Sequence, residues 1–488
     1  MRHRRTLTAI LLVGAAIVGL TGSVAAQESC GVDPPADFAE PSDPDATIGF
    51  VDGYWYTEPI AGLDSGPTTD EEMRALIART AARVEVIRCV NIEDPPPVRT
   101  VNRTALDADL TSLYADVSPA ERRFDNAKLE TLMLVPSTSD SVEQRTANQG
   151  TAVQGYYDIQ ADRIVIVEDN ATTVPIAGAT LAHELVHYYQ DQRYNLARYD
   201  AVQMDAGTAQ RGLIEGEAML TENAYEHRCA GTWDCVASAP SDRTTVTNRG
   251  LFAITLEPYL DGPEFVRTLE NHDQLSAAYE QPPTTARHVI HPEAYPTFEP
   301  QSPPIADRST AQWQPLRVPD RPDHGVLGPV GVAASLMTPQ FDNKTTEVGI
   351  PPYAYSHPIV DAWRGDRLRV YTTATNQTAA VWKSRWADAE AAEEYANEYA
   401  AVLEFYGATP VDEPVFRFDG TTGYTGSVRV TQTNTTVTIV KAPSADALDA
   451  VHASNRSVQQ TAGTPGFGAL GAIVALCWAV WSRVRTQP

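Results

Sequence analysis

The chain has 488 residues, long enough for one to three domains, and its 43% hydrophobic residues argue against wholesale disorder. A net charge of −26 excludes nucleic acid as a partner, because phosphate binding requires clustered positive charge. Only four of the 37 basic residues are lysines. An acidic, lysine-poor surface suits concentrated salt, which screens self-repulsion, although a GC-rich genome is another explanation. We expect a folded protein from a halophile.

The N-terminus has the three parts of a secretory signal peptide. A basic head is followed by an apolar run from Leu7 to Leu20 and by small residues before Gln27. We therefore predict a signal peptide over residues 1–26 and export, by the general or the twin-arginine route. Residues 27–46, rich in Pro, Asp and Ser, are predicted to be a loose leader.

Hydrophobic spacing predicts a first, larger domain over residues 47–340. Its expected elements, in chain order, are a helix that begins at Thr69-Asp70, a buried strand Leu132–Val135, a hairpin of Val153–Asp158 and Arg163–Glu168, helices over 181–192 and 207–228, a proline-rich loop over 292–322, and an apolar helix over 326–337.

A smaller α+β domain is predicted over residues 341–453. It should contain strands near 368–371, 379–382, 428–430 and 437–440, a helix over 388–406 and a short helix that begins at Ser444. Residues 454–464 are predicted to be a polar stalk.

Four cysteines lie in the part of the chain expected outside the cell, where an even number suggests two disulfides. Cys229 and Cys235 can close a small loop and leave Cys30 with Cys89, but three pairings are possible. Six sequons are consistent with a glycoprotein: Asn102, Asn170, Asn343, Asn376, Asn434 and Asn455.

The segment His183-Glu184-Leu185-Val186-His187 is an HExxH motif. On a helix, residues four apart share a face, so both imidazoles can reach one metal ion. The carboxylate of Glu184 is then placed to take a proton from water at the metal. The motif predicts a zinc site with His183 and His187 as ligands and Glu184 as general base.

Catalytic zinc needs a third protein ligand and an open position. We expect Glu215, 28 residues beyond His187, on a second helix that crosses the first. The alternatives are Glu217, which lies about 200° round the helix from Glu215 and should not ligate together with it, and Glu222, on the same face as Glu215.

The sequence HELVHYYQDQ over 183–192, with the Glu-Gly-Glu-Ala segment over 215–218, resembles the gluzincin class of zinc metallopeptidases, and is closest to exported prokaryotic proteins with HExxHxxQDQ. The resemblance implies a zincin-like α+β domain, a mixed sheet with the HExxH helix, and supports Glu215 as third ligand. Weaker matches extend over most of residues 150 to 405. The chain departs from thermolysin-like enzymes at Met219, where they have an Asp that orients a histidine; Asp191 is our candidate for that role.

The C-terminus reads Thr464-Pro465-Gly466-Phe467, then apolar residues to Trp481, then arginines. A helix of roughly 15 residues reaches only ~22 Å, short of the ~30 Å hydrocarbon core. Residues 465–488 resemble the PGF C-terminal sorting signal of archaeal surface proteins. This resemblance implies removal of the tail by an archaeosortase and attachment of a lipid at the outer face of the membrane. The alternative is a short transmembrane anchor.

These features predict a zinc-dependent hydrolase at the cell surface, in the S-layer environment of a haloarchaeon, that acts on a peptide or protein substrate. His291 is the candidate oxyanion donor, and the strand Arg163–Glu168 is expected to bind extended substrate by main-chain pairing. A rival hypothesis is a non-catalytic cell-envelope or binding protein on a zincin scaffold. A zinc hydrolase of a non-peptide substrate is a third.

Overall fold

A computed structural model describes the main chain of residues 9–13 and residues 30, 33–61, 69–167, 177–235, 246–269, 272–412 and 414–454. Most of the predicted signal peptide, nearly all of the predicted stalk and the whole predicted sorting segment lie outside these residues. Contacts divide the chain into Met1–His452 and Ala453–Pro488, and the fold described below is that of the first unit. Within the described residues, no helix combines the length and apolar character needed to cross a membrane.

A four-stranded mixed sheet lies in the N-terminal half, in the order β1 (Ala9–Val13), β5 (Val153–Asp158), β6 (Arg163–Val167) and β4 (Val98–Val101). The predicted hairpin is confirmed as antiparallel β5 and β6. β4 runs parallel to β6, and β1 runs antiparallel to β5. Both edges of β6 are therefore paired, which corrects the expectation that substrate pairs with this strand.

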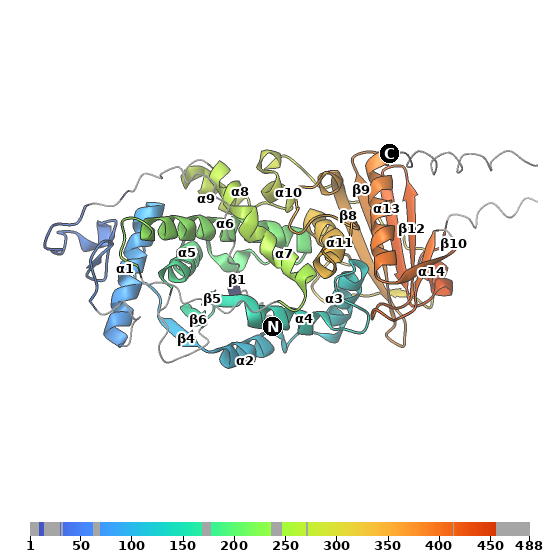
Figure 1. Cartoon of the computed structure of the whole chain (residues 1–488), viewed down its shortest axis with the longest axis horizontal. Helices are drawn as coiled ribbons and strands as arrows, with labels where there is room; N and C mark the ends of the chain where they lie inside the picture. The colour runs from blue at the N-terminus through green and yellow to red at the C-terminus, as the bar shows by residue number, and fades with distance from the viewer. Residues whose placement is uncertain are drawn as a thin grey trace, which may run out of the picture. The chain divides into compact units, whose positions relative to one another are not determined.

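Three long helices pack together beside this sheet: α1 (Asp70–Arg88), α5 (Gly178–Tyr194) and α6 (Met204–Cys229) (Figure 1). α1 begins as predicted, because Thr69 and Glu72 form a reciprocal capping box. A buried core, including Leu76, Tyr157 and Leu185, joins α1 and α5 to the sheet. The HExxH segment therefore lies on a helix that is packed on several sides.

Shorter elements surround these helices. They are β2 (Phe50–Val51), β3 (Tyr54–Trp55), α2 (Arg103–Tyr114), α3 (Pro119–Thr131), α4 (Ser141–Ala152), α7 (Arg249–Leu260), α8 (Gly262–Thr268), α9 (His272–Glu280), α10 (Arg287–Ile290), α11 (Gly328–Asp342) and α12 (Pro358–Asp361), with 3₁₀ turns η1 (Pro44–Ala46), η3 (Leu196–Arg198) and η4 (Pro292–Ala294).

A seven-stranded antiparallel sheet forms the C-terminal part of the unit. Its order is β10 (Ala408–Asp412), β11 (Val415–Phe418), β12 (Ser427–Thr433), β13 (Thr436–Ala442), β9 (Thr378–Trp386), β8 (Trp363–Thr372) and β7 (Gln314–Pro315). Helices α13 (Ala389–Phe405) and α14 (Ala445–Val451) complete it, close to the predicted positions (Figure 1).

One hydrophobic core joins this sheet to the preceding helices. It includes Leu129 of α3, Leu336 of α11, Trp382 of β9 and Tyr399 of α13. Buried Asp366 of β8 accepts hydrogen bonds from the backbone N–H groups of residues 327 and 328 and from the indole of Trp382. Helix α11 runs through the boundary predicted between residues 340 and 341, so the two parts share a core there.

The predicted strand Leu132–Val135 is wrong. These apolar residues are buried, but they form a turn after α3 in which Met133 has a φ of 57°. The backbone of Leu134 and Val135 bonds back to Leu129 instead of to a neighbouring strand. A short apolar run indicates that residues are buried without specifying a strand, and these residues are buried in a turn.

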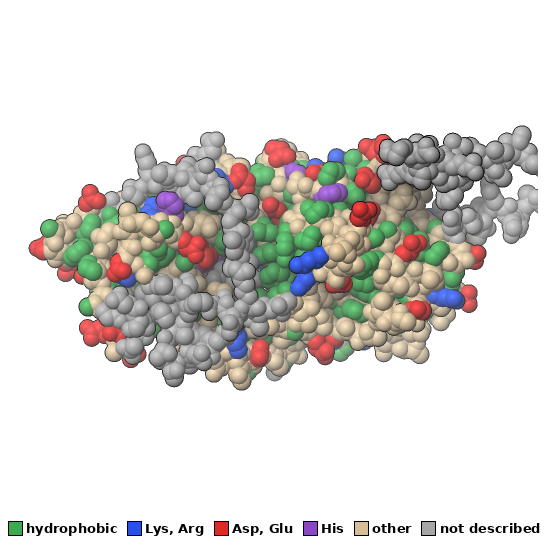
Figure 2. Space-filling view, in the orientation of Figure 1, with side chains coloured by type: hydrophobic (Ala, Val, Ile, Leu, Met, Phe, Trp, Pro, Cys, Tyr) green, Lys and Arg blue, Asp and Glu red, His purple; other side chains and the backbone are tan. Residues whose placement is uncertain are grey.

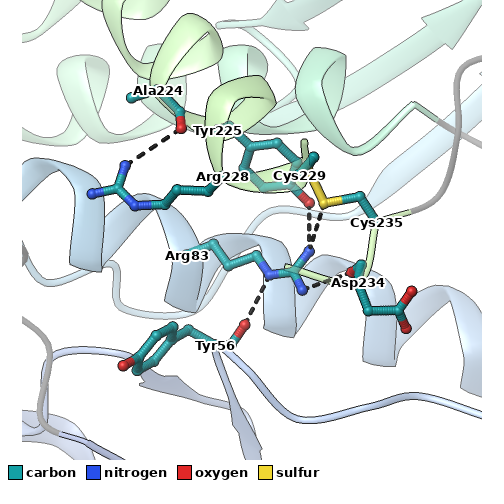
Figure 3. Close-up of a disulfide and its surroundings, with 8 residues drawn as sticks. All are labelled: Tyr56, Arg83, Ala224, Tyr225, Arg228, Cys229, Asp234 and Cys235. Carbon is teal, nitrogen blue, oxygen red and sulfur yellow. Dashed lines mark hydrogen bonds between the residues drawn. A yellow bond between two sulfur atoms is a disulfide. The ribbon is translucent and has the colours of Figure 1, made fainter. Parts of the chain in front are cut away.

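Two disulfides join Cys30 to Cys89 and Cys229 to Cys235, one of the three pairings that the sequence allows. Figure 3 shows the second bond at the end of α6, where Arg83 of α1 points toward it. The Arg83 guanidinium donates to the hydroxyl of Tyr225 and to the backbone carbonyls of Tyr56 and Asp234. This buried arginine ties α1 to the C-terminal end of α6.

Acidic side chains are scattered over the face shown in Figure 2, where arginines and lysines are fewer. This distribution follows from a composition with 63 acidic and 37 basic residues. Mixed α and β structure, the coarse fold class predicted from the sequence, is confirmed.

Candidate metal centre

Helix α5 carries both histidines of the HExxH motif on its buried side. The imidazole rings of His183 and His187 lie 4.8 Å apart between centroids, and neither side chain is exposed. The start of the helix is held close to its neighbours at two glycines. A Cβ on Gly178 would lie 2.5 Å from the hydroxyl of Tyr225, and one on Gly155 of β5 would lie 3.2 Å from Thr180 of α5.

Helix α6 crosses α5 and brings Glu215 to the two histidines. Oε2 of Glu215 lies 3.3 Å from Nε2 of His183 and 3.3 Å from Nε2 of His187. The three ligand atoms fall within 4.8 Å of one another, and all three side chains are buried. The structure therefore brings together the three ligands expected from the sequence.

The glycines of α6 explain how the helix carrying Glu215 is held in place. A Cβ on Gly216 would lie 2.5 Å from the carbonyl carbon of Gly262, at the start of α8. Conversely, a Cβ on Gly262 would lie 2.5 Å from the carbonyl oxygen of Gly212. Two backbones meet here without side chains between them, so the Gly of the Glu-Gly-Glu-Ala segment is required for packing.

Each histidine is oriented by a separate partner at Nδ1. Nδ1 of His183 lies 2.9 Å from Oε2 of Glu222, and Nδ1 of His187 lies 2.8 Å from Oε1 of Gln190. Because both partners present an oxygen acceptor, each Nδ1 carries a proton and donates it. Both Nε2 atoms then face Glu215, the arrangement in which histidine binds a metal ion.

The electrostatics of the cluster reflect its crowded carboxylates. Burial by itself lowers the pKa of His183, but hydrogen bonds to Glu215 and Glu222 outweigh burial and raise the pKa to about 10. Burial raises the pKa of Glu215, yet His187 and His183 outweigh it and lower the pKa to about 2.

Glu184 is completely buried, and neither of its carboxylate oxygens has a hydrogen-bond partner among the described residues. Burial raises its pKa to about 7, although His187 and His183 act in the opposite direction. A buried carboxylate without a partner is costly for folding. Its position directly after a ligand therefore indicates a group that is kept available for water or substrate.

Tyr259 of α7 is a further residue of the site, and no role was predicted for it from the sequence. Its ring is stacked on His183 at 6.4 Å between centroids. Burial raises its pKa well above the usual value, and the charge of Glu215 and a hydrogen bond to it act in the same direction. Tyr259 therefore keeps its proton and can donate it in a hydrogen bond.

The other candidates lie elsewhere. Nε2 of His291 lies 2.6 Å from Oδ1 of Asp361, and no contact among the described residues joins His291 to the histidine cluster. Asp191 accepts from the backbone N–H of Leu196 and from the hydroxyl of Tyr157. The orienting role expected for Asp191 belongs to Gln190 and Glu222.

The two alternative ligands have other contacts. Glu222 binds the far side of His183, as described above. Glu217 points to Arg88, Gln190 and Tyr279 and lies outside the group of possible ligands. The spacing of Gln190, three residues after His187 on the same helix, is the signal that could have identified it from the sequence.

Comparison with known proteins gives no function for this centre. A family model described as a domain of unknown function (DUF8575) matches residues 314–452. This range covers the seven-stranded sheet with α13 and α14, and it does not include the histidine cluster. Neither a curated protein nor a solved structure matches the chain.

Proposed function

We propose that this chain is a zinc-dependent hydrolase that cleaves peptide bonds at the cell surface. The observation that carries the proposal is the convergence of Nε2 of His183, Nε2 of His187 and Oε2 of Glu215, with each Nδ1 already engaged. Two imidazoles and one carboxylate form a ligand set of catalytic zinc sites, and three protein ligands leave a position open. The HExxH helix beside a mixed sheet also supports a zincin-like domain.

Zinc held by these three residues would supply Lewis-acid chemistry, polarising a carbonyl group and acidifying water. Glu184 takes the proton of the attacking water and returns it to the leaving amine, a task suited to a carboxylate with a raised pKa. Tyr259 donates a hydrogen bond to the oxyanion that develops on the substrate, the role that we first expected for His291.

The strand that binds substrate in this proposal is β5. It contacts α5 at Gly155 and Thr180, and its outer edge pairs with Ala9–Val13, which belongs to the predicted signal peptide. Removal of residues 1–26 would free that edge for an extended peptide. We expect the chain that retains residues 1–26 to cleave peptides more slowly than the chain that begins at Gln27. Equal rates would contradict this assignment.

Export and anchoring complete the proposal. Two disulfides support an oxidising location outside the cytoplasm. The partners proposed from the sequence are an archaeosortase-type enzyme that removes the tail near residues 465–467 and a membrane lipid attached in its place. Mass spectrometry of the mature C-terminus tests this, since an intact peptide that ends at Pro488 would establish a tail helix instead.

The test of the proposed function is Glu184→Gln, which removes the base and keeps almost the same volume. Zinc content should stay near one per chain in high salt, while cleavage of a broad peptide library should fall by roughly 10²–10⁴, the usual contribution of general acid–base catalysis. The matched control is Glu143→Gln at an exposed site on α4, which should leave cleavage unchanged.

Two outcomes would contradict the proposal. If the wild-type chain contains zinc but cleaves no peptide, the hypothesis of a binding protein on a zincin scaffold is favoured. If Glu184→Gln cleaves as fast as the wild type, Glu184 is not the base. Loss of zinc in His183→Ala or His187→Ala checks the ligands independently of cleavage.

A further inference from the structure

A buried polar cluster lies behind the metal centre, at the meeting point of four helices. Glu217 of α6, only 1% exposed, accepts at Oε1 from the guanidinium of Arg88 of α1, at 2.8 Å. At Oε2 it accepts from the hydroxyl of Tyr279 of α9, at 2.7 Å, and from Nε2 of Gln190 of α5, at 3.0 Å. Both oxygens of the carboxylate are therefore engaged.

This cluster fixes which way the amide of Gln190 faces. Its Nε2 lies 2.9 Å from the carbonyl oxygen of Ile214 and beside the carboxylate of Glu217, and both of these groups can only accept. Reversing the amide would place its oxygen against two acceptors. The NH₂ group must therefore face Glu217, and Oε1 must face His187.

The direction of the hydrogen bond from Tyr279 is also determined. Burial raises the pKa of Tyr279 well above its usual value, and the charge of Glu217 and a hydrogen bond to it act in the same direction. The hydroxyl consequently keeps its proton and donates it to Glu217, which leaves its oxygen able to accept from Gln190 at 2.8 Å. The orientation of every group between Arg88 and His187 is thus set by donor and acceptor chemistry.

We propose that Glu217 is a positioning residue of the metal centre, which acts through Gln190 to keep the Nδ1 proton on His187 and so to present Nε2 to the metal ion. This inference rests on the proposed function, because it assigns a role toward the metal ion. It also gives the two glutamates of the Glu-Gly-Glu-Ala segment different tasks. Glu215 binds the metal ion, and Glu217 orients one of its histidine ligands from behind.

The two histidines are held in different ways. His183 is oriented directly by Glu222, a carboxylate whose side chain is 17% exposed. His187 is oriented by the neutral amide of Gln190. The charged residue here is buried Glu217, which binds that amide and not His187 itself. Outer partners of metal-bound histidines commonly contribute 10–100-fold in metal affinity. Disruption of the Glu217 cluster should weaken metal binding by a similar factor although no ligand is changed.

The experiment measures zinc affinity by competition with a chromogenic chelator, in high salt, for the wild type, Gln190→Met and Glu217→Gln. Both variants should bind zinc 10–100-fold more weakly than the wild type. Tyr279→Phe removes a single donor to Glu217, and it provides a milder variant that should fold and still weaken zinc binding measurably.

The matched control is Asp366→Asn, which alters a buried carboxylate in a different part of the unit. This substitution should lower the thermal midpoint and leave zinc affinity unchanged. If Gln190→Met, Glu217→Gln and Tyr279→Phe bind zinc as tightly as the wild type, or lose no more affinity than Asp366→Asn, the positioning role is wrong and the proposed function is unaffected.

A second measurement needs no metal ion. In protein with ¹⁵N-labelled histidine, the signal of His187, identified by its loss in His187→Asn, should show a protonated Nδ1 in the wild type. Gln190→Met should redistribute the proton between the two ring nitrogens. An unchanged signal in Gln190→Met would overturn the inference even if the wild type binds no zinc, an outcome that would separately refute the proposed function.

Discussion

Gly216, between the two glutamates of α6, allows a quantitative test of the contact that holds Glu215 in place. An added Cβ would lie 2.5 Å from the carbonyl carbon of Gly262 and 3.0 Å from its Cα. Because carbon atoms in ordinary contact are about 3.5–4.0 Å apart, Gly216→Ala must push α6 and the start of α8 apart by about 1 Å. The obstructing atoms are backbone atoms, so no side chain can rotate away.

Two opposing effects set the expected magnitude for Gly216→Ala. Ala favours a helix over Gly by about 1 kcal/mol, whereas forcing an extra carbon into a packed interior costs about 1–3 kcal/mol or more. We expect the clash to dominate and to lower the free energy of unfolding by about 1–2 kcal/mol. Zinc affinity should fall as well, because the displaced helix carries Glu215.

Gly150→Ala in α4 is the matched control. A Cβ there would meet Oδ1 of Asp107, the end of an exposed side chain that can rotate away, so the helical preference of Ala should dominate. Urea-induced unfolding in high salt compares the two variants. If Gly216→Ala unfolds at the same urea concentration as Gly150→Ala, or at a higher one, the close approach of α6 and α8 does not constrain the site.

Two further predictions concern the chemistry of the centre. Tyr259→Phe should keep zinc and lower kcat by about 10²-fold, the effect of losing one oxyanion donor; an unchanged kcat would exclude Tyr259 from that role. Zinc binding should release a proton from His183, whose pKa is raised to about 10. Between pH 7 and 9 the apparent zinc affinity should therefore rise about tenfold per pH unit, and calorimetry at pH 8 in buffers of different ionisation enthalpy should detect the released proton. Zinc binding that is independent of pH would contradict the predicted release of a proton from His183.

The parts of the site that the sequence predicts are those that depend on one helix or one hairpin. His183 and His187 share a face because they are four residues apart, and β5 and β6 form a hairpin because two apolar segments flank a short polar turn. The third ligand required more, since the spacing alone left Glu217 and Glu222 as alternatives to Glu215 and the resemblance to gluzincins was needed to support Glu215. The rotation of α6 decides among the three, and packing at Gly216 and Gly262 sets that rotation.

Contacts between distant segments account for the remaining differences. Nε2 of His291 contacts Asp361, 70 residues away, and Tyr259 stacks on His183 from α7, a helix that was not predicted from the sequence. Neither pair follows a periodic pattern, so the sequence contains no local signal for it. Leu132–Val135 shows the same limit for the fold, because an apolar run indicates burial without distinguishing a strand from a turn.

The charges on the side chains of α5 and α6 around the two histidines are consistent with the proposed binding of a divalent cation. Glu184, Glu215 and Glu222 surround the two histidines, and none of the three has an ion pair with an arginine or lysine among the described residues. Hydrogen bonds to Glu215 and Glu222 raise the pKa of His183, and burial raises the pKa of Glu184, so both groups favour a bound proton. In the proposed function, a divalent ion held by His183, His187 and Glu215 would add positive charge, which would favour the ionised form of Glu184 that acts as the base. The three carboxylates around the histidines are therefore suited to the divalent ion that the proposed reaction requires.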